Sequence, residues 1–499
     1  MFRKIRIILA VLFFAGVTSL LLDFTGALHG WLGWMAKIQF LPAVMAANFV
    51  TIAALCLLTI LFGRVYCSVI CPLGVYQDAV SWLSSRRKGK RARFRPKKEL
   101  KWLRYGVWVL FVAALVAGVQ VFVALLAPYS AWGRIVDSIF APAVKGFNNL
   151  LALLDQRIGT YNVYPREVWL KSLPALLVAV VTLILVTVLA WRGGRTWCND
   201  VCPVGTTLGF LSRFSMFRPS VDYSKCRECL ACERKCKASC IDIKAARIDY
   251  SRCVDCFDCL DSCKAGALKY RFAWKKAVTA GGEEPSGTGD GGRRAFLIGS
   301  AILAGETVVR SQEKKVDGGF AAIAAKKAPK RDVPVTPFGS SGVRDFYRRC
   351  TACQLCVAAC PNNVLRPSSD LSRLMQPEMS YEKGWCRPEC TRCSQVCPSG
   401  AIKPVSVEEK TDYHVGTARV NRELCIVETD GVSCGNCARK CPRGAIRMVP
   451  VNPDDPESLR RPAVVEERCI GCGACENLCP ARPFSAITVN GREEHIIKD

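Results

Sequence analysis

The sequence has little histidine and little methionine, and this narrows the redox groups that it can hold. Its 499 residues include seven methionines and three histidines, His29, His414 and His495. No Cys-x-x-Cys-His occurs, so covalently attached c-type haem is excluded. Only His29 lies near the apolar part of the chain, which excludes a b-type haem held by two histidines. The same shortage disfavours copper ligation.

Acidic residues are also few compared with basic ones. The chain has 42 Asp and Glu against 69 Lys and Arg, a formal charge of +27. Such a charge can indicate nucleic-acid binding. However, the densest basic run, "RRKGKRARFRPKK" at 86–98, stands between two apolar segments, where it is typical of a membrane topology signal. We therefore expect no nucleic-acid partner.

Half of the residues are hydrophobic, and they concentrate before residue 192. Four apolar stretches are close to, or longer than, the roughly 20 residues that a helix needs to cross a bilayer core. These expected spans are residues 7–22, 40–63, 105–127 and 173–191. The first could instead be a cleaved signal peptide after "MFRKIR", but Asp23 follows it and no clear cleavage site appears, which favours an anchor.

The Lys and Arg bias sets the expected orientation of these spans. The basic loop at 86–98 should be cytoplasmic, whereas 23–39 and 128–172 carry few basic residues and should face outward. Both ends of the predicted four-helix bundle then lie inside.

One twelve-residue pattern occurs twice, each time after an apolar run. "GRVYCSVICPLG" spans 63–74 and "GRTWCNDVCPVG" spans 194–205, 131 residues further on. This indicates a duplicated helical hairpin that ends in Cys-x3-Cys-Pro at the cytoplasmic face. We expect one 4Fe–4S cluster at that membrane surface, shared by Cys67, Cys71, Cys198 and Cys202. The alternatives are structural thiols or two separate partial sites, and Cys56 is interpreted as a buried hydrophobe.

Two further runs have the spacing of bacterial ferredoxins. "CRECLACERKC" at 226–236 and "CVDCFDCLDSC" at 253–263 both read Cys-x2-Cys-x2-Cys-x3-Cys, in which the fourth cysteine ligates the other cluster. The predicted ligand sets are Cys226, Cys229, Cys232 with Cys263, and Cys253, Cys256, Cys259 with Cys236. Zinc sites rarely repeat this triple spacing. Lys237 and Lys264 stand where Pro is usual, and the spare Cys240 could replace Cys236.

Four more runs follow, each ending in Cys-Pro. They are Cys350, Cys353, Cys356, Cys360; Cys386, Cys390, Cys393, Cys397; Cys425, Cys434, Cys437, Cys441; and Cys469, Cys472, Cys475, Cys479. In all, 24 of the 30 cysteines fall into six ferredoxin sets. Six clusters in series predict electron conduction, and a seventh would come from the duplicated element. The sequence leaves the pairing of these four runs open.

A linker separates the two groups of runs. "AGGEEPSGTGDGG" at 280–292 is typical of a flexible segment. "RRAFLIGSAILAGETVV" at 293–309 resembles a twin-arginine export signal, and "AAIAAKKAP" at 321–329 could be cleaved. The alternative is an incidental basic, apolar helix.

The chain as a whole resembles two known families. Residues 1–270, including "TGALHGWLGWMAKIQFLPA" and both Cys-x3-Cys-Pro elements, resemble the NapH-type membrane iron–sulfur protein. Residues 293–499 resemble the NapG/MauM-type polyferredoxin. The expected fold is multidomain: an all-α membrane bundle of four helices, then α+β bacterial ferredoxin-like modules. The expected domains are 1–220 (membrane), 221–272 (two-cluster ferredoxin), 273–340 (linker with signal) and 341–499 (four-cluster polyferredoxin).

The resemblance implies a quinol dehydrogenase-type electron-transfer component with no haem and no flavin. In these families the two parts are usually separate partners that pass electrons from the membrane quinone pool to a periplasmic reductase, such as a nitrate reductase-like acceptor. We therefore expect a protein of the bacterial inner membrane, with its N-terminus and first ferredoxin in the cytoplasm and its polyferredoxin in the periplasm. The alternatives are a redox maturation factor for a metalloenzyme and a passive conducting subunit of a larger oxidoreductase.

Quinol oxidation needs a proton acceptor beside an apolar slot, and His29 is the only histidine near the spans. We expect Trp31 and Trp34 to wall the quinol and Lys37 or Gln39 to bind its oxygen. The alternative is that these residues are interfacial anchors. The site would then lie around Tyr66, Gln77, Asp78 and Trp197.

Overall fold

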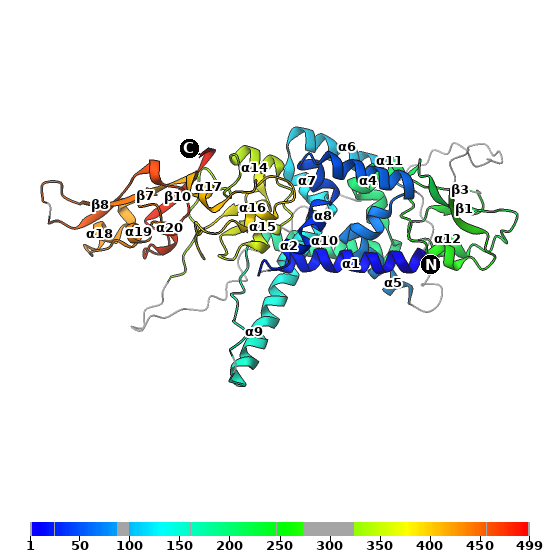
Figure 1. The fold of residues 1–499 in the computed structure, drawn as a ribbon, viewed down its shortest axis with the longest axis horizontal. Coiled ribbons are helices and arrows are strands. Elements are labelled where there is room, and N and C mark those ends of the chain that lie inside the picture. The colour runs from blue at the N-terminus through cyan, green and yellow to red at the C-terminus, as the bar shows by residue number, and fades with distance from the viewer. Residues whose placement is uncertain are drawn as a thin grey trace, which may run out of the picture.

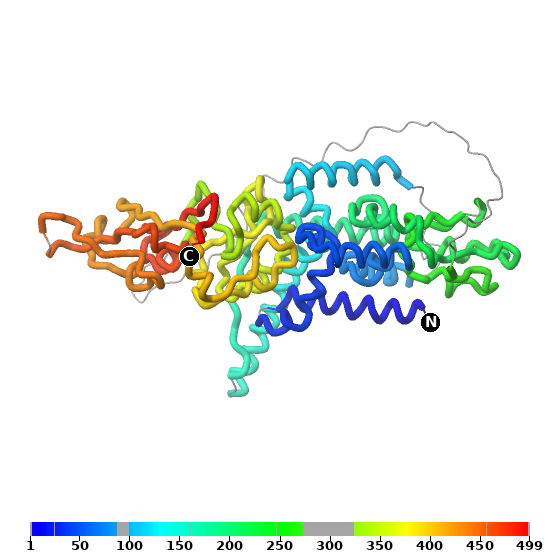
Figure 2. The backbone as a smooth tube through the Cα atoms, turned by 45° about the horizontal axis from the view of Figure 1, so that its top comes forward, coloured from blue at the N-terminus to red at the C-terminus, as the bar shows by residue number. Residues whose placement is uncertain are grey.

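The computed structural model describes residues 2–23, 25–86, 99–159, 161–245, 247–272, 324–455 and 457–497. They form three bodies in a row (Figures 1 and 2). The helical body (residues 2–212) lies in the middle, the small cluster domain (217–272) at one end and the large cluster domain (324–497) at the other. Most of the basic run, the Gly-rich linker and the Arg-Arg signal lie outside the described residues.

The helical body is built from short and long helices. They are α1 (Phe2–Leu22), α2 (His29–Lys37), α3 (Phe40–Met45), α4 (Phe49–Phe62), α5 (Pro72–Ser85), α6 (Lys101–Ala117), α7 (Gln120–Leu126), α8 (Pro128–Ile135), α9 (Ala141–Arg157), α10 (Leu173–Gly193) and α11 (Pro203–Ser212). Three π-helical turns interrupt them: η1 (Tyr66–Ile70), η3 (Val136–Phe140) and η4 (Trp197–Val201).

Two of the four expected spans are unbroken helices. Among the described residues only α1 and α10, with 21 residues each, are long and apolar enough to cross a bilayer alone. The second span breaks at Ala47, which has φ 51°, and Asn48 then caps α4 by accepting the Thr51 N–H. The third span is divided at Gly118, whose left-handed conformation ends α6, and the chain then continues as α7. The helical N-terminal region is confirmed, whereas two of its four expected spans are each divided into shorter helices.

Helix α8 turns back into the helical body, and all eight of its residues are buried. Trp132 packs against Phe14 of α1 and Tyr76 of α5, with ring centroids 5.0 and 5.4 Å apart. Arg134 donates to the carbonyls of Ala124 and Leu125 at the end of α7, where a cation is favourable. Helix α9 then projects sideways from the body, across the direction of α1 (Figure 1).

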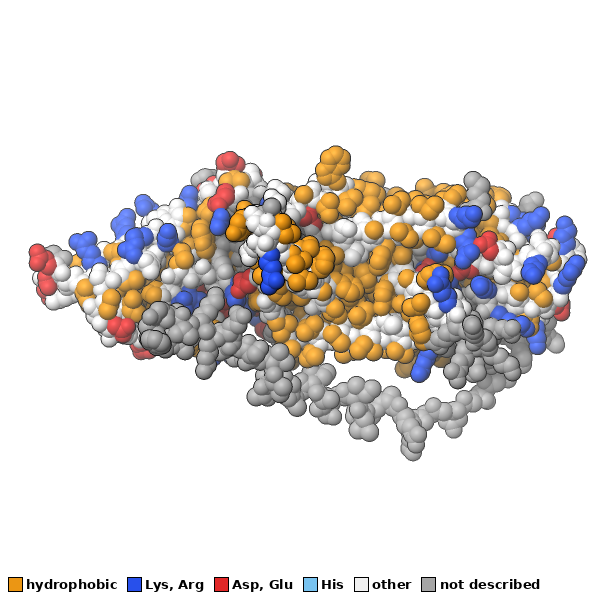
Figure 3. Space-filling view, turned by 90° about the horizontal axis from the view of Figure 1, so that it is seen from below, with side chains coloured by type: hydrophobic (Ala, Val, Ile, Leu, Met, Phe, Trp, Pro, Cys, Tyr) orange, Lys and Arg blue, Asp and Glu red, His pale blue; other side chains and the backbone are white. Residues whose placement is uncertain are grey.

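The surface of the helical body is apolar. Figure 3 shows a broad hydrophobic band across the middle of the molecule and Lys and Arg side chains on the cluster domains at both ends. Val116 on α6 and Val181 on α10 are 77% and 62% exposed, and α9 exposes Phe147, Leu150 and Leu153. Soluble monomers rarely expose apolar surface of this extent, so the band marks an interaction surface.

The small cluster domain is a compact α+β unit. Its strands β1 (Phe217–Val221) and β4 (Leu268–Phe272) pair antiparallel, as do β2 (Ile241–Asp242) and β3 (Arg247–Ile248). Two one-turn helices, α12 (Ala231–Lys235) and α13 (Asp258–Ser262), each lie within one cysteine run.

The large cluster domain repeats this plan twice. Its elements are α14 (Val343–Arg349), α15 (Leu355–Ala359), β5 (Leu365–Pro367), η5 (Leu371–Arg373), β6 (Pro377–Met379), α16 (Arg392–Val396), α17 (Val407–Asp412), β7 (Tyr413–Val420), η6 (Arg422–Leu424), α18 (Ile426–Thr429), α19 (Asn436–Arg439), β8 (Ile446–Pro450), β9 (Arg460–Val464), η7 (Glu466–Arg468), α20 (Ala474–Leu478) and β10 (Ile487–Ile497). Three antiparallel pairs form, β5–β6, β7–β10 and β8–β9.

The large cluster domain packs tightly on the helical body. A Cβ added to Gly133 of α8 would lie 2.1 Å from the carbonyl oxygen of Cys353, so backbone touches backbone there. At the rim, the hydroxyls of Ser172 and Ser369 are 3.2 Å apart. One hydrophobic core therefore runs from the helical body into both cluster domains.

Candidate iron–sulfur centres

The two Cys-x3-Cys-Pro elements have the same local conformation. Helices α4 and α10 end at Gly63 and Gly194, whose φ values of 76° and 70° favour glycine. A π-helical turn follows, the second cysteine is extended, and proline takes the first position of α5 or α11, where its missing N–H costs nothing.

The two elements also lock onto each other reciprocally. Nη2 of Arg64 donates to the carbonyl of Cys198 at 3.1 Å, and Nη1 of Arg195 donates to the carbonyl of Cys67 at 2.8 Å. Gly74 makes room for this contact, because an added Cβ would lie 2.2 Å from the Cys67 oxygen. The interleaved pair fixes both cysteine turns relative to one another.

This lock gathers the four thiols inside the helical body. Cys67, Cys71, Cys198 and Cys202 are each only 4% exposed, and Cys202 is within electrostatic range of the other three. Their expected position at the cytoplasmic membrane surface stays a prediction. The chain turns back into the helical body after Gly63 and Gly194, which encloses the cysteines in protein, and α5 and α11 run outward again from them.

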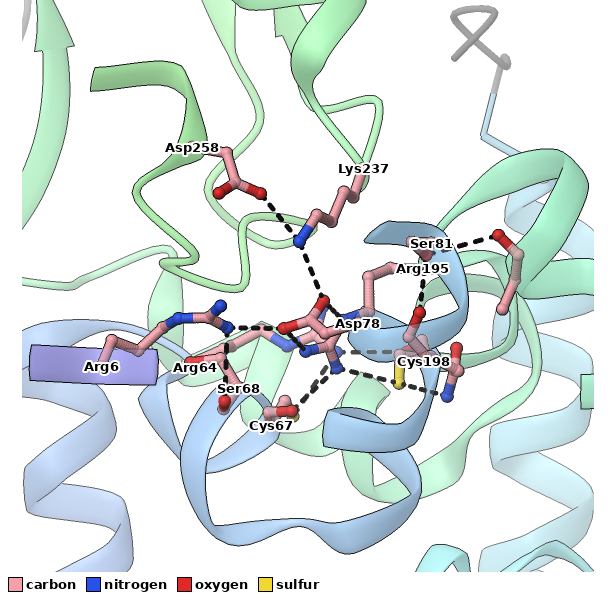
Figure 4. A network of polar contacts seen from close by, with 12 residues as sticks. Arg6, Arg64, Cys67, Ser68, Asp78, Ser81, Arg195, Cys198, Lys237 and Asp258 are labelled. Atoms are coloured by element: carbon pink, nitrogen blue, oxygen red, sulfur yellow. Dashed lines mark hydrogen bonds and ion pairs between the residues drawn. The ribbon is translucent and has the colours of Figure 1, made fainter. Parts of the chain in front are cut away.

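The charges around these thiols are unbalanced (Figure 4). Asp78 pairs with Arg6 and Arg195 at 2.5 and 2.8 Å, and Lys237 bridges it to Asp258. The guanidinium of Arg64 meets no carboxylate among the described residues.

Arg64 is fully buried and donates to Asn199 Oδ1 and to the Ser251 carbonyl instead. Arg6, Arg195 and Lys237 thus share the carboxylates of Asp78 and Asp258, and Arg64 has none within the described part of the chain, in a region where an unpaired charge is costly. Iron-bound thiolates carry net negative charge, so the four cysteines and their surroundings fit an anionic 4Fe–4S cluster.

Four small cavities in the cluster domains are each lined by cysteines of two runs. They are lined by Cys253, Cys256, Cys259 with Cys236 and Cys240; by Cys386, Cys390, Cys393 with Cys360; by Cys469, Cys472, Cys475 with Cys441; and by Cys425, Cys434, Cys437 with Cys479. Every cavity takes its fourth cysteine from the neighbouring run. In the large cluster domain, the first run therefore pairs with the second and the third with the fourth.

The two remaining sets follow the same rule. Burial raises the pKa of Cys356, and the nearby thiols of Cys350, Cys353 and Cys397 raise it further. Burial likewise raises the pKa of Cys232 to about 11, with Cys263 and Cys226 contributing. Such thiols stay protonated unless a metal supplies positive charge, which deprotonates a coordinating thiol.

The backbone of the cysteine runs is strained in a repeated way. Positive φ occurs at the second and fourth residues after the first cysteine in all four runs of standard spacing. These residues are Glu228 and Leu230, Asp255 and Phe257, Ala352 and Gln354, and Gly471 and Gly473. A non-glycine residue in this region costs about 1–3 kcal/mol, and such strain clusters at ligand-binding sites. The same turn therefore wraps four separate sites.

Cys240 lies beside two predicted ligands. Its Sγ is 3.5 Å from that of Cys236, and both line the cavity formed with Cys253. The structure thus places two candidates for one ligand position. Lys237, which replaces the usual proline, ties the small cluster domain to the helical body: its carbonyl accepts the Arg195 N–H at 2.9 Å.

The arrangement of the described thiols does not offer a site for a single metal ion. Within the described residues, no group of three Cys, His, Asp or Glu is close enough to bind one metal ion. Zinc would need four ligands around one centre. A 4Fe–4S cluster binds one thiolate at each of four irons, which spreads the sulfurs apart.

Hydrogen bonds and close backbone contacts link the cysteine sets of the three bodies. Asp255, between Cys253 and Cys256, accepts the Arg64 N–H at 3.0 Å. On the other side, α8 contacts Cys353, and the Cys386 N–H donates to the Cys472 carbonyl at 3.0 Å. The set built from the two Cys-x3-Cys-Pro elements is the middle link.

The expected quinol residues do not form one slot. His29 pairs with Asp23 at 3.1 Å, while Trp31 is 82% exposed and Trp34 is half exposed. Gln39 is buried and accepts from the Tyr66 hydroxyl, and Lys37 is exposed. None of these five residues lines a cavity described here.

The alternative quinol residues expected from sequence lie close to the Cys-x3-Cys-Pro elements. Gln77 donates to Cys198 Sγ at 3.2 Å, and Asp78 forms a salt bridge with Arg6. Tyr66 and Trp197 are buried in the two π-helical turns. Sequence reasoning missed Arg6 and the roles of Arg64 and Arg195. The duplicated "GR" before each element was the available signal for the latter two.

Two protein-family models match the chain. A 4Fe–4S binding domain matches residues 44–91 and 172–221, which hold the two Cys-x3-Cys-Pro elements. A 4Fe–4S dicluster domain matches residues 349–401 and 432–482 of the large cluster domain. The chain is thus an iron–sulfur protein with a helical N-terminal region and ferredoxin-type domains.

Several named proteins are similar in sequence. The ferredoxin-type protein MauN of Paracoccus denitrificans is 26% identical over 175 residues, 35% of this chain and 48% of that one. The ferredoxin-type protein NapH of Haemophilus influenzae is 26% identical over 178 residues, 36% and 48% respectively. The ferredoxin-type protein MauM of Methylobacillus flagellatus is 33% identical over 120 residues, 23% and 50%. The chain spans about half the length of these relatives, and no solved structure matches it.

Proposed function

Because the chain is a homologue of the ferredoxin-type proteins NapH, MauN and MauM, we propose that it is a membrane-bound electron conductor. It passes electrons from membrane quinol along its chain of 4Fe–4S clusters to a periplasmic reductase or small carrier. The observation that carries this proposal is the series of linked cysteine sets, whose middle member is buried in the helical body between two cluster domains.

The apolar band of the helical body supports membrane integration. Helices α1 and α10 run along its length, and the exposed apolar residues of α9 lie across that direction. An amphipathic helix in this position is typical of the plane of a membrane interface. The bilayer would then surround the helical body, with α9 at the face where the large cluster domain sits.

Charge supports a cytoplasmic small cluster domain. The densest basic run of the sequence, 86–98, joins α5 to α6, and α5 lies on the side of the helical body next to the small cluster domain. The large cluster domain is at the opposite end, consistent with the export signal inferred from sequence. We therefore propose that the protein sits in the bacterial inner membrane with its polyferredoxin in the periplasm.

Helix α8 supplies the route between the middle set and the large cluster domain. Trp132 contacts Tyr76, one turn after Pro72 and Cys71, and the next residue, Gly133, touches Cys353. Each bound cluster would take up and release electrons. The residues of α8 exclude water and keep the two cysteine sets a short distance apart, so the route needs no mobile carrier.

The test joins two measurements on one variant. The full chain with Cys67→Ser and Cys198→Ser should lose one cluster, so its iron content should fall from about 28 to about 24 atoms per chain. In liposomes, dithionite outside should reduce ferricyanide trapped inside through the unmodified protein but not through this variant. Cys56→Ser, which changes a cysteine outside every set, is the matched control.

Unchanged iron in the double variant would exclude the shared cluster. Retained ferricyanide reduction after loss of that iron would exclude the middle set as the route across the membrane.

A further inference from the structure

The largest cavity described in the molecule is not at a cysteine. It has a volume of about 280 Å³ and lies where η3, α9 and the start of α10 meet the large cluster domain. Its lining includes Asp137, Lys145, Trp169, Lys171, Leu176 and Pro367. A cavity of this kind, mostly apolar with a few polar groups, is typical of a small-molecule site.

The polar groups of this cavity suit a ring with two oxygens. The carboxylate of Asp137 is buried and accepts from Lys171 Nζ at 2.6 Å. The indole Nε1 of Trp169 is buried and finds no acceptor among the described residues. A buried donor without a partner costs about 1–3 kcal/mol, which an acceptor on a bound ligand would recover.

The mouth of the cavity is apolar and opens beside α9. Val168 and Leu170 line it and are each nearly half exposed. They adjoin the first turn of α10 and the base of α9, whose Phe147 and Leu150 are exposed. A ligand dissolved in the membrane would reach the cavity from this side.

The inner wall of the cavity reaches the first cysteine set of the large cluster domain. Ala175 lines the cavity and packs with Ala352 and Met375. The N–H of Ala352 donates to Cys350 Sγ at 3.4 Å. One hydrophobic cluster therefore connects the wall of the cavity to this cysteine set.

We propose that this cavity binds the headgroup of a membrane quinol and is the place where it is oxidised. The assignment rests on the proposed function, which supplies the oxidised 4Fe–4S clusters as electron acceptors. The quinol would give up two electrons, one to each of two clusters bound by neighbouring cysteine sets, and both of its O–H bonds would break. Asp137 takes the first proton and passes it to water through Lys145 or Lys171; the second proton follows the same way, and the quinone leaves.

Lys145 is suited to this exchange. Burial lowers its pKa below the ordinary value for lysine, and the positive charge of Lys171 lowers it further. The opposite oxygen of the ring accepts from Trp169 Nε1, which fixes the orientation of the headgroup.

Binding can be tested without any cluster chemistry. A photoreactive azido-quinone should label the full chain within residues 137–145 or 168–176, and excess unlabelled quinone should compete. Val168→Trp, a change at the partly exposed mouth, should weaken this labelling at least tenfold. His29→Ala, which changes the residue expected from sequence, should leave it unchanged.

Reaction is tested on the loaded protein. Asp137→Asn should slow cluster reduction by a quinol by about a hundredfold, the range of a lost general base, while reduction by dithionite stays the same. Because this change leaves Lys171 without its buried partner, Val168→Trp serves as the second variant and should also slow the quinol reaction alone. Labelling within residues 29–39, or quinol kinetics that neither variant changes, would overturn the assignment.

The two proposals fail separately. Labelling at the cavity together with retained electron transfer in the Cys67→Ser, Cys198→Ser variant would leave the quinol site standing and remove the middle cluster from the route. Loss of transmembrane transfer in that variant with labelling elsewhere would do the opposite.

Discussion

The two Cys-x3-Cys-Pro elements share their hydrogen bonds but not their charges. In each, an arginine crosses to the cysteine carbonyl of the other, and its guanidinium lies 3.7–3.8 Å from its own cysteine sulfur. However, Asp78 in the first element corresponds to Gly209 in the second, 131 residues later. Asp78 holds Arg6 and Lys237, whereas Gly209 leaves space for Arg104 and the Ser251 carbonyl.

The difference separates two roles within one duplicated scaffold. The shared arginines and glycines fix the four cysteines. The divergent positions dock the neighbours: Asp78 joins α1 and the small cluster domain through salt bridges, and Gly209 admits α6. Changes to shared positions should therefore abolish the site, and changes to divergent positions should loosen its surroundings.

The largest effect is expected from Gly74→Ala, and an equal one from Gly205→Ala. Each new Cβ would meet a cysteine carbonyl oxygen, at 2.2 and 2.3 Å, and that oxygen belongs to a locked turn. The loss of stability should reach the roughly 4–5 kcal/mol that marks exceptional single changes, and one cluster of iron should be lost with it. Thermal unfolding in detergent and iron analysis measure both.

Gly106→Ala is the matched control for this pair. Gly106 lies in the exposed face of α6, with no atom within 4 Å of an added Cβ, and its replacement should stabilise the helix by about 0.5–1 kcal/mol. If Gly74→Ala and Gly205→Ala differed widely in effect, the two elements would not share one site.

Asp78→Asn should have the next largest effect. It leaves Arg6, Arg195 and Lys237 without their shared buried carboxylate, a change that costs about 3–5 kcal/mol in buried pairs. The small cluster domain should become more accessible to protease, because Lys237 is one of its anchors. Asp261→Asn breaks an exposed pair with Arg3 and should cost no more than about 1 kcal/mol. Equal protease sensitivity in the two variants would show that Asp78 does not dock the domain.

Sequence spacing predicted the ferredoxin sets because the ligands are local. Three of the four cysteines in each set stand within one run, and the structure gathers the runs into pairs with the fourth cysteine exchanged. The duplicated "GR…C…CP" pattern likewise predicted that Cys67 and Cys198 come together. The pairing of the four last runs needed the fold, since several pairings satisfy the same spacings.

The features that the sequence did not predict depend on contacts between segments that are far apart in the chain. Hydropathy predicted four spans, but it does not register that Gly63 and Gly194 turn the chain inward or that α8 re-enters the helical body. The cavity at Asp137 is built from two separate segments, 137–145 and 168–176, together with Pro367 of another domain. No single window of sequence contains it, whereas His29 stood out only because histidine is rare.

The smallest expected effect sharpens the comparison at the sulfurs themselves. Gln77 donates to Cys198 Sγ at 3.2 Å, whereas its counterpart Leu208 has no donor to offer Cys67. Hydrogen bonds to cluster sulfurs favour the more negative, reduced state. Gln77→Leu removes about 1 kcal/mol of this preference, and should lower the potential of the middle cluster by on the order of 40 mV for one electron.

A redox titration followed by electron paramagnetic resonance measures this shift. The six other potentials should stay constant, and so should all seven in Ser85→Ala, a change at the exposed end of the same helix. A potential that Gln77→Leu leaves unchanged would mean that Cys198 is not bound to iron, since a thiolate ligand at this distance must respond to the loss of its donor. The two Cys-x3-Cys-Pro elements would then share their backbone conformation, but only the first would bind iron and contribute to the electron path.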